Sequence, residues 1–553
     1  MMCEGKFIFL AFAFLVLTAF ASVSAAKTIY VPDDYLTIQS AVNAASTGDT
    51  IIVRDGLYKE HVIVNKQLTI KSERGYANCV VNGEGSDVFA LYADGIRIEG
   101  FTITGGRHGI FINSNNNSIS NNNISSNNED GIYIPSSNNN IISNNIISNN
   151  DDGISLWYSN NNCISDNIIS NNNNGTYIYH SNNNSISNNN ILNNGYGIYL
   201  EYSNGTNILN NNISNNGCGI YLWYSNKSSI SYNNISYNGY GIILGWCYYG
   251  YSNENSISYN NISYNGFSIV IYGSGNIISN NNISSNYYNG VGISGSNNII
   301  SNNIICSNKW EGLAYAIFLY SSNNNIIYMN NFINNTCNVY SYNSTNIWNS
   351  TEPITYTYRG SEITNYMGNY WDDYTGSDAN GDGIGETPYI IDENNTDNYP
   401  LIEGFENYLV ETPTPTPAQT FDTGRPENPY PSISGKFIGT IKTNKKIIAR
   451  KLYTYACEGT GGHTEYALIC NKTWCAEAKW EGYKEDWMNI SFNRTVVLMP
   501  YETYNITIVT GSYPQIHHTA SLKTENGWIN CTEFTDANGK KYNDWIPAIM
   551  LWS

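Results

Sequence analysis

Acidic side chains recur at a fixed interval in the first half of the chain. Glu129 and Asp130 recur as Asp151 and Asp152, at a step of 22 in the numbering. If the chain folds so that residues at this interval lie side by side, the four carboxylates form one patch. Paired carboxylates can act as the acid and the base that cleave a glycosidic bond. The plainer interpretation is that they are turn residues at a solvated corner, and the sequence leaves both open.

Aromatic residues recur at the same interval a few positions further on. Trp157 and Tyr179 are separated by the same step of 22, and Tyr202 and Trp223 follow at nearby positions of the next two intervals. Flat rings with polar edges suit the faces of sugar rings. We therefore predict that these four side chains contact a glycan. The alternative is that exposed aromatic residues simply favour strands.

A third candidate site is the acidic stretch DANGDGIGE, which has the pattern of the first half of an EF-hand calcium loop. Its twelfth position is Tyr389 and not a bidentate glutamate, so Asp372, Asp373 or Asp392 must supply the closing ligand. The alternative is a metal-free loop of Asx turns that closes the repeat region. The predicted calcium ligands are Asp378, Asn380, Asp382, Ile384 and Glu386.

The element that must position these residues is a repeat of about 22 residues. Each repeat holds three short β-branched segments, separated by Asn, Ser and Gly turns. One such coil cannot bury its apolar side alone, whereas stacked copies make three parallel sheets around one core. The predicted fold class is all-β, a right-handed parallel β-helix with about 22 residues per coil. The columns that define the period are Ile142, Ile164, Ile186, Ile208 and Ile230; Ile147, Ile169, Ile191, Ile213 and Ile235; and Gly109, Gly131, Gly153, Gly175, Gly197, Gly219 and Gly241.

Asparagine dominates the turns of this repeat. A series with the same period runs through Asn145, Asn167 and Asn189 and continues to Asn233. Stacked side-chain amides can hydrogen-bond along the axis, as they do in cross-β assemblies. Asparagine also tolerates the left-handed backbone of a sharp corner, and we expect the glycine column to supply the same freedom at another corner. A disordered spacer is the compositional alternative, and the strict period argues against it.

The two ends of the repeat differ from its middle. Residues 37–70 predict a short amphipathic helix followed by strands, which would cap the open N-terminal end. The stretch GWCYYGYSNEN interrupts the period after Gly241 and predicts a loop that protrudes from one corner. The expected segments are a signal peptide at 1–26, an N-terminal cap and first coils at 27–105, β-helix repeats at 106–350, a C-terminal cap with the Asp-rich loop at 351–411, a Pro/Thr linker at 412–420 and a Cys-containing β-rich domain at 421–553.

The N-terminus has the pattern of a secretory signal. Lys6 precedes the apolar run FIFLAFAFLVLTAFA, and small residues follow up to Ala26. A membrane anchor is the alternative, but the run is short, and no second stretch is long enough to span a bilayer. The net charge of -19 argues against nucleic acid as a partner, because phosphate binding needs basic patches. The partner that we expect is an extracellular or envelope polysaccharide or glycoprotein.

The composition changes after the linker. The C-terminal segment contains Cys457, Cys470, Cys475 and Cys531, which suggest two disulfides with three possible pairings in a secreted domain. Alternating runs such as YNITIVTG and TVVLMP predict a β-sandwich-like fold for this segment.

The N-terminal cap, the Asn-rich coils and the segment GNYWDDYTGSDANGDGIGETPYIIDENNTDNYPL resemble the NosD-like β-helix family over about residues 28–403. The resemblance implies a secreted prokaryotic protein with carbohydrate-binding and sugar-hydrolysis-type repeats, common among archaeal surface proteins. The family includes a protein linked to copper delivery, but these coils lack a matching cluster of Cys, His and Met, so copper does not carry over. The acidic patch also lacks the Gly-His-Gly and Arg-x-Lys motifs that accompany clustered aspartates in polygalacturonase-like enzymes.

These observations favour a secreted or cell-surface β-helix protein that binds glycans or serves as a structural or adhesive component of the envelope. The alternative is a polysaccharide-active glycoside hydrolase or lyase that uses the acidic patch at residues 129–152. Calcium is the one cofactor that the sequence suggests.

Overall fold

The structure is a computed structural model that describes residues 26–246, 250–309, 314–410, 420–457, 462–471, 474–480, 488–511 and 513–552. The chain divides into two compact units, Met1–Leu409 and Val410–Ser553. The predicted signal peptide lies outside the described residues except for Ala26, and the predicted linker does so except for Thr420. The segment boundaries drawn from the sequence stay predictions.

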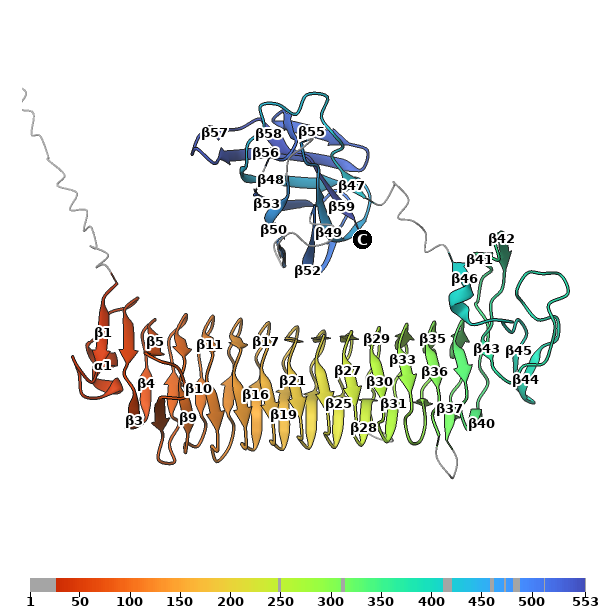
Figure 1. Ribbon diagram of the computed structural model, residues 1–553, viewed down its shortest axis with the longest axis horizontal. Helices are drawn as coiled ribbons and strands as arrows, with labels where there is room; N and C mark the ends of the chain where they lie inside the picture. The colour runs from red at the N-terminus through yellow and green to blue at the C-terminus, as the bar shows by residue number, and fades with distance from the viewer. Residues whose placement is uncertain are drawn as a thin grey trace, which may run out of the picture. The chain divides into compact units, whose positions relative to one another are not determined.

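The first unit is a stack of coils in which three parallel sheets run along the axis (Figure 1). Sheets A and B contain 14 strands each, and sheet C contains 13. The predicted all-β parallel β-helix of the right-handed type is therefore confirmed.

The strands of each sheet follow one another at every third position of the chain order. Sheet A consists of β1 (Thr28–Val31), β2 (Thr50–Val53), β5 (Thr69–Ser72), β8 (Arg97–Glu99), β11 (Ser118–Ser120), β14 (Ile141–Ser143), β17 (Cys163–Ser165), β20 (Ser185–Ser187), β23 (Asn207–Leu209), β26 (Ser229–Ser231), β29 (Ser256–Ser258), β32 (Ile277–Ser279), β35 (Ile299–Ser301) and β38 (Ile326–Tyr328). Sheet B consists of β3 (Gly56–Lys59), β6 (Cys79–Asn82), β9 (Thr102–Thr104), β12 (Asn123–Ser125), β15 (Ile146–Ser148), β18 (Ile168–Ser170), β21 (Asn190–Leu192), β24 (Asn212–Ser214), β27 (Asn234–Ser236), β30 (Asn261–Ser263), β33 (Asn282–Ser284), β36 (Ile304–Cys306), β39 (Asn331–Ile333) and β43 (Tyr370–Trp371).

Sheet C has the longest strands of the three. Its middle strands reach six residues, whereas the neighbouring strands of sheets A and B have three. Longer strands give sheet C the widest outer face, and the aromatic columns lie there. Sheet C consists of β4 (Val62–Val64), β7 (Phe89–Leu91), β10 (Ile110–Ile112), β13 (Ile132–Pro135), β16 (Asp152–Trp157), β19 (Asn174–Tyr179), β22 (Tyr196–Glu201), β25 (Cys218–Trp223), β28 (Tyr240–Leu244), β31 (Phe267–Ile271), β34 (Val291–Ile293), β37 (Tyr315–Tyr320) and β40 (Cys337–Tyr342).

The isoleucine columns form the core that the sequence predicts. Ile186 pairs with Ile208 between β20 and β23, and Ile191 pairs with Ile213 between β21 and β24. All four side chains are fully buried. Identical side chains one coil apart therefore stack along the axis and fill the interior continuously.

The predicted asparagine ladder is present. Hydrogen bonding along the axis and turning of the corner are carried by two different asparagines. The Nδ2 group of Asn189 donates to Oδ1 of Asn211 at 3.0 Å and to the carbonyl of Ile164 at 2.9 Å. The residue before it, Asn188, has the left-handed φ of 57°. One asparagine thus bonds along the axis while its neighbour turns the corner. Two further ladders, which the sequence interpretation missed, run through Asn117, Asn140, Asn162 and Asn184, and through Asn127, Asn150, Asn172, Asn194, Asn216 and Asn238.

The glycine column has a different role from the predicted one. Gly175 is not among the residues with a left-handed backbone. A Cβ added at Gly175 would lie 2.5 Å from the carbonyl oxygen of Gly197 and 3.0 Å from Cγ2 of Ile191. The prediction of a left-handed corner was wrong for this column. Glycine is required because successive coils approach too closely for any side chain.

The ends of the first unit break the period. The predicted short helix is α1 (Ile38–Ala44), which begins at a capping box of Thr37 and Ser40 and buries Ile38, Ala41 and Val42. Its role as a cap stays a prediction. At the other end lie β41 (Ile354–Tyr358), β42 (Ser361–Asn365), β44 (Tyr389–Asp392), β45 (Asn395–Asp397), the 3₁₀ helix η1 (Phe405–Asn407) and β46 (Tyr408–Val410).

An insertion lies where the sequence predicts a protruding loop. The ladder partners Asn233 and Asn260 are 27 residues apart, whereas Asn211 and Asn233 are 22 apart. The additional residues follow β28 and include Trp246, whose backbone N–H donates to the carbonyl of Gly250 at 2.8 Å. Residues 247–249 of the predicted loop lie outside the described residues.

The second unit is all-β around its own hydrophobic core. Its strands form an 11-stranded sheet and a separate two-stranded pair, so the two layers of the predicted sandwich are not confirmed. Cys470 and Cys475 form a disulfide, whereas Cys531 is a free thiol, so the second predicted bridge is not formed. The sheet order is β47 (Phe421–Asp422), β59 (Ile549–Trp552), β49 (Ile447–Thr454), β52 (Asn489–Leu498), β51 (Cys475–Lys479), β50 (Thr464–Cys470), β53 (Thr503–Thr510), β48 (Gly435–Thr443), β56 (Gly527–Asp536) and β55 (Ser521–Thr524), with β57 (Lys541–Tyr542) beside β56, and β54 (Ile516–His518) pairs separately with β58 (Trp545–Pro547).

No helix within the described ranges combines the length and the apolar character needed to cross a membrane.

Candidate functional site

The outer face of sheet C brings the predicted aromatic residues into register. Trp157 pairs with Tyr179 between β16 and β19, and Glu201 pairs with Trp223 between β22 and β25. Tyr179 in turn pairs with Glu201, so the four form one column along the axis. The prediction that residues one repeat apart become neighbours therefore holds for this surface. We call this surface, from β13 to β25, the aromatic face.

Tyr202 lies in the next column, where rings stack on one another. Its ring centroid is 4.8 Å from that of His180 and 4.9 Å from that of Tyr224, with interplanar angles of 7° in both cases. Both faces of Tyr202 are therefore occupied by neighbouring rings. Of the four predicted glycan contacts, Tyr202 can offer only its edge and its hydroxyl group, because a sugar stacks on an open ring face.

Trp157 is the ring best placed to meet a ligand. Its indole meets Tyr133 and Tyr177 at 79° and 85°, so neither ring lies flat against it. It leans over the small side chain of Ser155, to whose Oγ its Nε1 donates at 3.1 Å. The residue is 37% exposed. A small residue in the neighbouring column therefore makes room for the indole and leaves it accessible.

A carboxylate interrupts the aromatic column. Glu201 lies between Tyr179 and Trp223, and its Oε2 accepts a hydrogen bond from the hydroxyl of Tyr177 at 2.7 Å. Burial, followed by this contact with Glu201, raises the pKa of Tyr177 above its ordinary value, so the hydroxyl stays protonated. Rings beside a fixed hydrogen-bond acceptor form the combination that sugar hydroxyls and sugar faces require.

The acidic patch lies at the N-terminal side of the same face. His108, Asp130 and Asp152 occupy successive coils, and Nδ1 of His108 lies 3.4 Å from Oδ2 of Asp130. Nε2 of His108 lies 3.2 Å from Oε2 of Glu129, and Oδ1 of Asp152 accepts from Nδ2 of Asn174 at 2.7 Å. Asp130 and Asp152 are partly buried, whereas the side chains of Glu129 and Asp151 are exposed beside them.

Burial raises the pKa values of Asp130 and Asp152 by different amounts. Burial, and next the charge of Asp152, raise the pKa of Asp130 to about 8. Burial raises the pKa of Asp152 to about 6, against the opposing effect of the hydrogen bond from Asn174. Burial also lowers the pKa of His108, which favours the neutral imidazole. Asp130 therefore favours its protonated form to a higher pH than Asp152 does.

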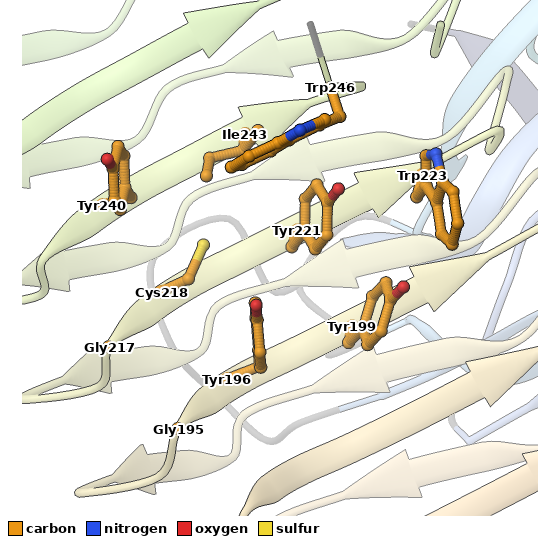
Figure 2. A pocket seen from close by; sticks show the side chains of 10 residues that line it. All are labelled: Gly195, Tyr196, Tyr199, Gly217, Cys218, Tyr221, Trp223, Tyr240, Ile243 and Trp246. Atoms are coloured by element: carbon orange, nitrogen blue, oxygen red, sulfur yellow. The ribbon is translucent and has the colours of Figure 1, made fainter. Parts of the chain in front are cut away.

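A hollow that the sequence interpretation missed lies further along the same sheet (Figure 2). It has a volume of about 510 Å³ and is lined mainly by aromatic residues of β22, β25 and β28. The signal was present, because Tyr196, Cys218 and Tyr240 follow one another at the same step as the other columns. The lining residues are Gly195, Tyr196, Tyr199, Gly217, Cys218, Tyr221, Trp223, Tyr240, Ile243 and Trp246.

The Asp-rich loop engages its carboxylates with its own backbone. Asp378 accepts from the N–H groups of Gly381 at 2.7 Å and Gly383 at 2.8 Å, and Glu386 accepts from the N–H of Ala379 at 2.7 Å. Similar bonds join Asn380, Asp382 and the N–H of Ile384. These are the Asx turns of the metal-free alternative.

The three carboxylates expected to close a calcium site have other partners. Asp373 accepts from the hydroxyl of Tyr389, Asp392 accepts from Nδ2 of Asn395, and Asp372 accepts from a backbone N–H. Calcium binding by this loop stays a prediction.

The fold and this surface define a class: a parallel β-helix protein in which the sheet with the longest strands presents an aromatic and acidic outer face. The chain belongs to the NosD family. The sequence model of that family, described as periplasmic copper-binding protein (NosD), matches residues 42–217, 200–276 and 218–376, which is more than half of the chain.

Other similarities are partial. A cell surface glycoprotein of Methanothermus fervidus is 35% identical over 98 residues, which is 17% of this chain and 16% of that protein. The A-module of mannuronan C-5 epimerase AlgE6 from Azotobacter vinelandii is 16% identical over 56% of this chain and 91% of that one, with a TM-score of 0.42. The catalytic domain of a GH87 α-1,3-glucanase is 13% identical over 59% and 69%, with a TM-score of 0.41. At these identities the likeness to solved structures concerns the fold alone.

The family description names copper. Within the part of the chain that the structure describes, no group of three or more His, Cys, Asp or Glu side chains is placed to hold a metal ion. The described residues therefore do not fit a copper centre of that kind, and no copper chemistry enters the proposals below.

Proposed function

We propose that this protein works outside the cell or in the envelope and binds a glycan chain on the aromatic face of sheet C. The similarity to a cell surface glycoprotein and to a periplasmic family supports the location. The observation that carries the binding proposal is the accessible indole of Trp157 in register with Tyr179, beside the acceptor Glu201.

A chain is a better ligand for this face than a single small molecule. The same kinds of side chain recur on successive coils, at the strand spacing of about 4.8 Å. A polymer of sugar rings offers repeated apolar faces and hydroxyl groups along its own axis. Several weak contacts made by one chain add up to useful affinity.

The experiment compares glycan retention by the wild type and by Trp157→Ala on an array of polysaccharides. Loss of the indole should lower retention about tenfold, because one ring contact contributes on the order of 1 kcal/mol beyond burial. Tyr259→Ala is the matched control, since Tyr259 is an exposed aromatic residue just after β29 of sheet A. Equal retention by Trp157→Ala and the wild type would reject the aromatic face as the binding surface.

A second candidate function is cleavage of the bound glycan. The observation that favours it is the pair Asp130 and Asp152, whose pKa values of about 8 and about 6 suit an acid and a base. Asp130 lies just before β13 and Asp152 begins β16, so the two carboxyl groups belong to adjacent coils of sheet C.

Release of new reducing ends tests this candidate. If it is correct, wild-type protein releases reducing ends from a retained glycan, and both Asp130→Asn and Asp152→Asn abolish release while retaining the glycan. Retention by the wild type without any release would remove cleavage and leave binding.

A further inference from the structure

One column of the sheet C face is interrupted by a small residue. Tyr196, Cys218 and Tyr240 pair in register on β22, β25 and β28 (Figure 2). Where two rings occupy neighbouring coils they stack, as Tyr240 and Phe267 do with centroids 5.0 Å apart and planes at 10°. Cys218 takes the place of one such ring. The column therefore contains a notch at Cys218, and this notch is part of the hollow of about 510 Å³.

The surroundings of the notch are aromatic and uncharged. Cys218, Tyr221 and Ile243 form a buried apolar floor. Trp246, from the inserted loop, lies with its ring centroid 6.4 Å from that of Tyr221 at 69°, and forms a wall. The described lining contains no Asp, Glu, Lys, Arg or His side chain, and burial raises the pKa of the Cys218 thiol above its ordinary value.

We propose that this notch binds one uncharged pyranose unit of the glycan, an inference that rests on the proposed function. One C–H face of such a ring would meet Tyr240, whose opposite face packs on Phe267. Its edge would meet Tyr196, whose ring stacks on Tyr199 and Tyr221. Its hydroxyl groups would meet the tyrosine hydroxyls and the indole N–H of Trp246 at the rim.

Charge and continuity decide the class of sugar. A uronate would bring a carboxylate into a hollow whose described lining offers no cation, in a protein of net charge -19. The notch also adjoins the aromatic face, because Trp223 lies at the end of the same strand as Cys218 and lines the hollow. A chain that follows the aromatic face therefore reaches the notch without leaving sheet C.

The test fills the notch with the ring that the column lacks. Cys218→Tyr should weaken binding of a neutral oligosaccharide by about tenfold or more in titration calorimetry, because the new ring excludes the sugar. Cys218→Ala keeps the space and should bind within about twofold of the wild type. The wild type should prefer the neutral oligosaccharide to a uronate oligosaccharide of equal length.

A second variant protects the test against misfolding. Trp246 is 48% exposed and lies outside the regular coils, so Trp246→Ala should fold and still weaken binding of the neutral oligosaccharide. Wild-type affinity in both Cys218→Tyr and Trp246→Ala, or a preference for uronates, would overturn the notch. Loss in Trp157→Ala alone would overturn the notch and keep the aromatic face, whereas no glycan binding by the wild type would overturn both.

Discussion

At the scale of single residues, the spacing of the acidic patch brings carboxyl groups close enough to change their pKa values. Asp130 and Asp152 are ordinary carboxylates in the sequence, and the fold places them on successive coils of sheet C with partly buried side chains. Burial is the main cause of their raised pKa values, and the charge of Asp152 adds to the shift of Asp130. The effect of the Asp152 charge on the pKa of Asp130 can therefore be measured separately from the effect of burial.

The first prediction isolates this coupling. Asp152→Asn removes a negative charge beside Asp130, so the pKa of Asp130 should fall below its wild-type value of about 8 and stay above 3.8, because burial remains. The measurement is an NMR titration of the Asp130 carboxyl carbon. Asp166→Asn, on an exposed corner, should leave that titration unchanged. An unaltered Asp130 pKa in Asp152→Asn would show that the two carboxylates do not interact.

At the scale of the coil, close approach and amide ladders hold the strands in place. The backbone of one coil contacts the next at the glycine column, and the corner asparagines bond along the axis. Both features act on buried groups, so substitutions there cost far more than substitutions at exposed positions of the same residue type.

The second prediction concerns the glycine column. Gly175→Ala should lower the free energy of unfolding by about 1–3 kcal/mol or more, because the new Cβ would meet the Gly197 carbonyl. Gly292→Ala is the control, since its nearest atom lies 3.8 Å from the added Cβ, and it should change little. Chemical denaturation measures both. Equal stability of the two variants would contradict the assigned role of the column.

The third prediction concerns the ladder. Asn189→Ala should cost several kcal/mol, about 1–3 for each buried partner left unpaired, because Asn189 bonds Asn211, Ile164 and Ser187. Asn190→Ile is the neighbouring control, because Ile168 already occupies that position in the coil before it. Thermal melts should show a large loss for the first and little for the second. Similar melts would mean that the ladder contributes little.

The period of the sequence was enough to predict the coils, the core columns and the residues that share a surface column. It could not predict how rings orient within a column, so Tyr202 was included although its faces are covered. The notch exists because Cys218 has no aromatic ring where its column neighbours do. A search of the sequence for aromatic residues does not find such a position. The role of the glycines depends on the distance between coils, and only coordinates supply it.

At the scale of the whole first unit, carboxylates end two of the asparagine ladders. In the ladder through Asn189 the amides donate toward the following coil. At its C-terminal end Asn369 donates from its backbone N–H and its Nδ2 to Oδ2 of Asp397 at 2.7 and 3.2 Å. Trp371 also donates to Oδ2, at 3.0 Å. The Oδ2 atom of Asp397 accepts all three of these bonds, so it meets donors that have no further coil to contact. A second ladder ends where Asn395 donates to Asp392.

The fourth prediction follows from the burial of Asp397, which raises its pKa to about 6 from an ordinary value near 3.8. Since the native pKa is the higher one, the stabilising contribution is full below about pH 4 and is lost as the pH rises through about 6. Between pH 4 and 7 the wild type should lose about 2 kcal/mol relative to Asp397→Asn. Denaturation curves at several pH values measure this difference. A difference that does not change with pH would contradict the assignment, and Asp166→Asn serves as the control.

The central claim is that a glycan lies along the outer face of sheet C, and hydroxyl-radical footprinting of aromatic side chains tests it most directly. A retained polysaccharide should protect Trp157, Tyr179 and Trp246 from oxidation. Tyr232 and Tyr259, which stack on each other at another corner with centroids 5.0 Å apart, should react as they do without glycan. Protection of Tyr232 and Tyr259 with no change at Trp157 would contradict the account.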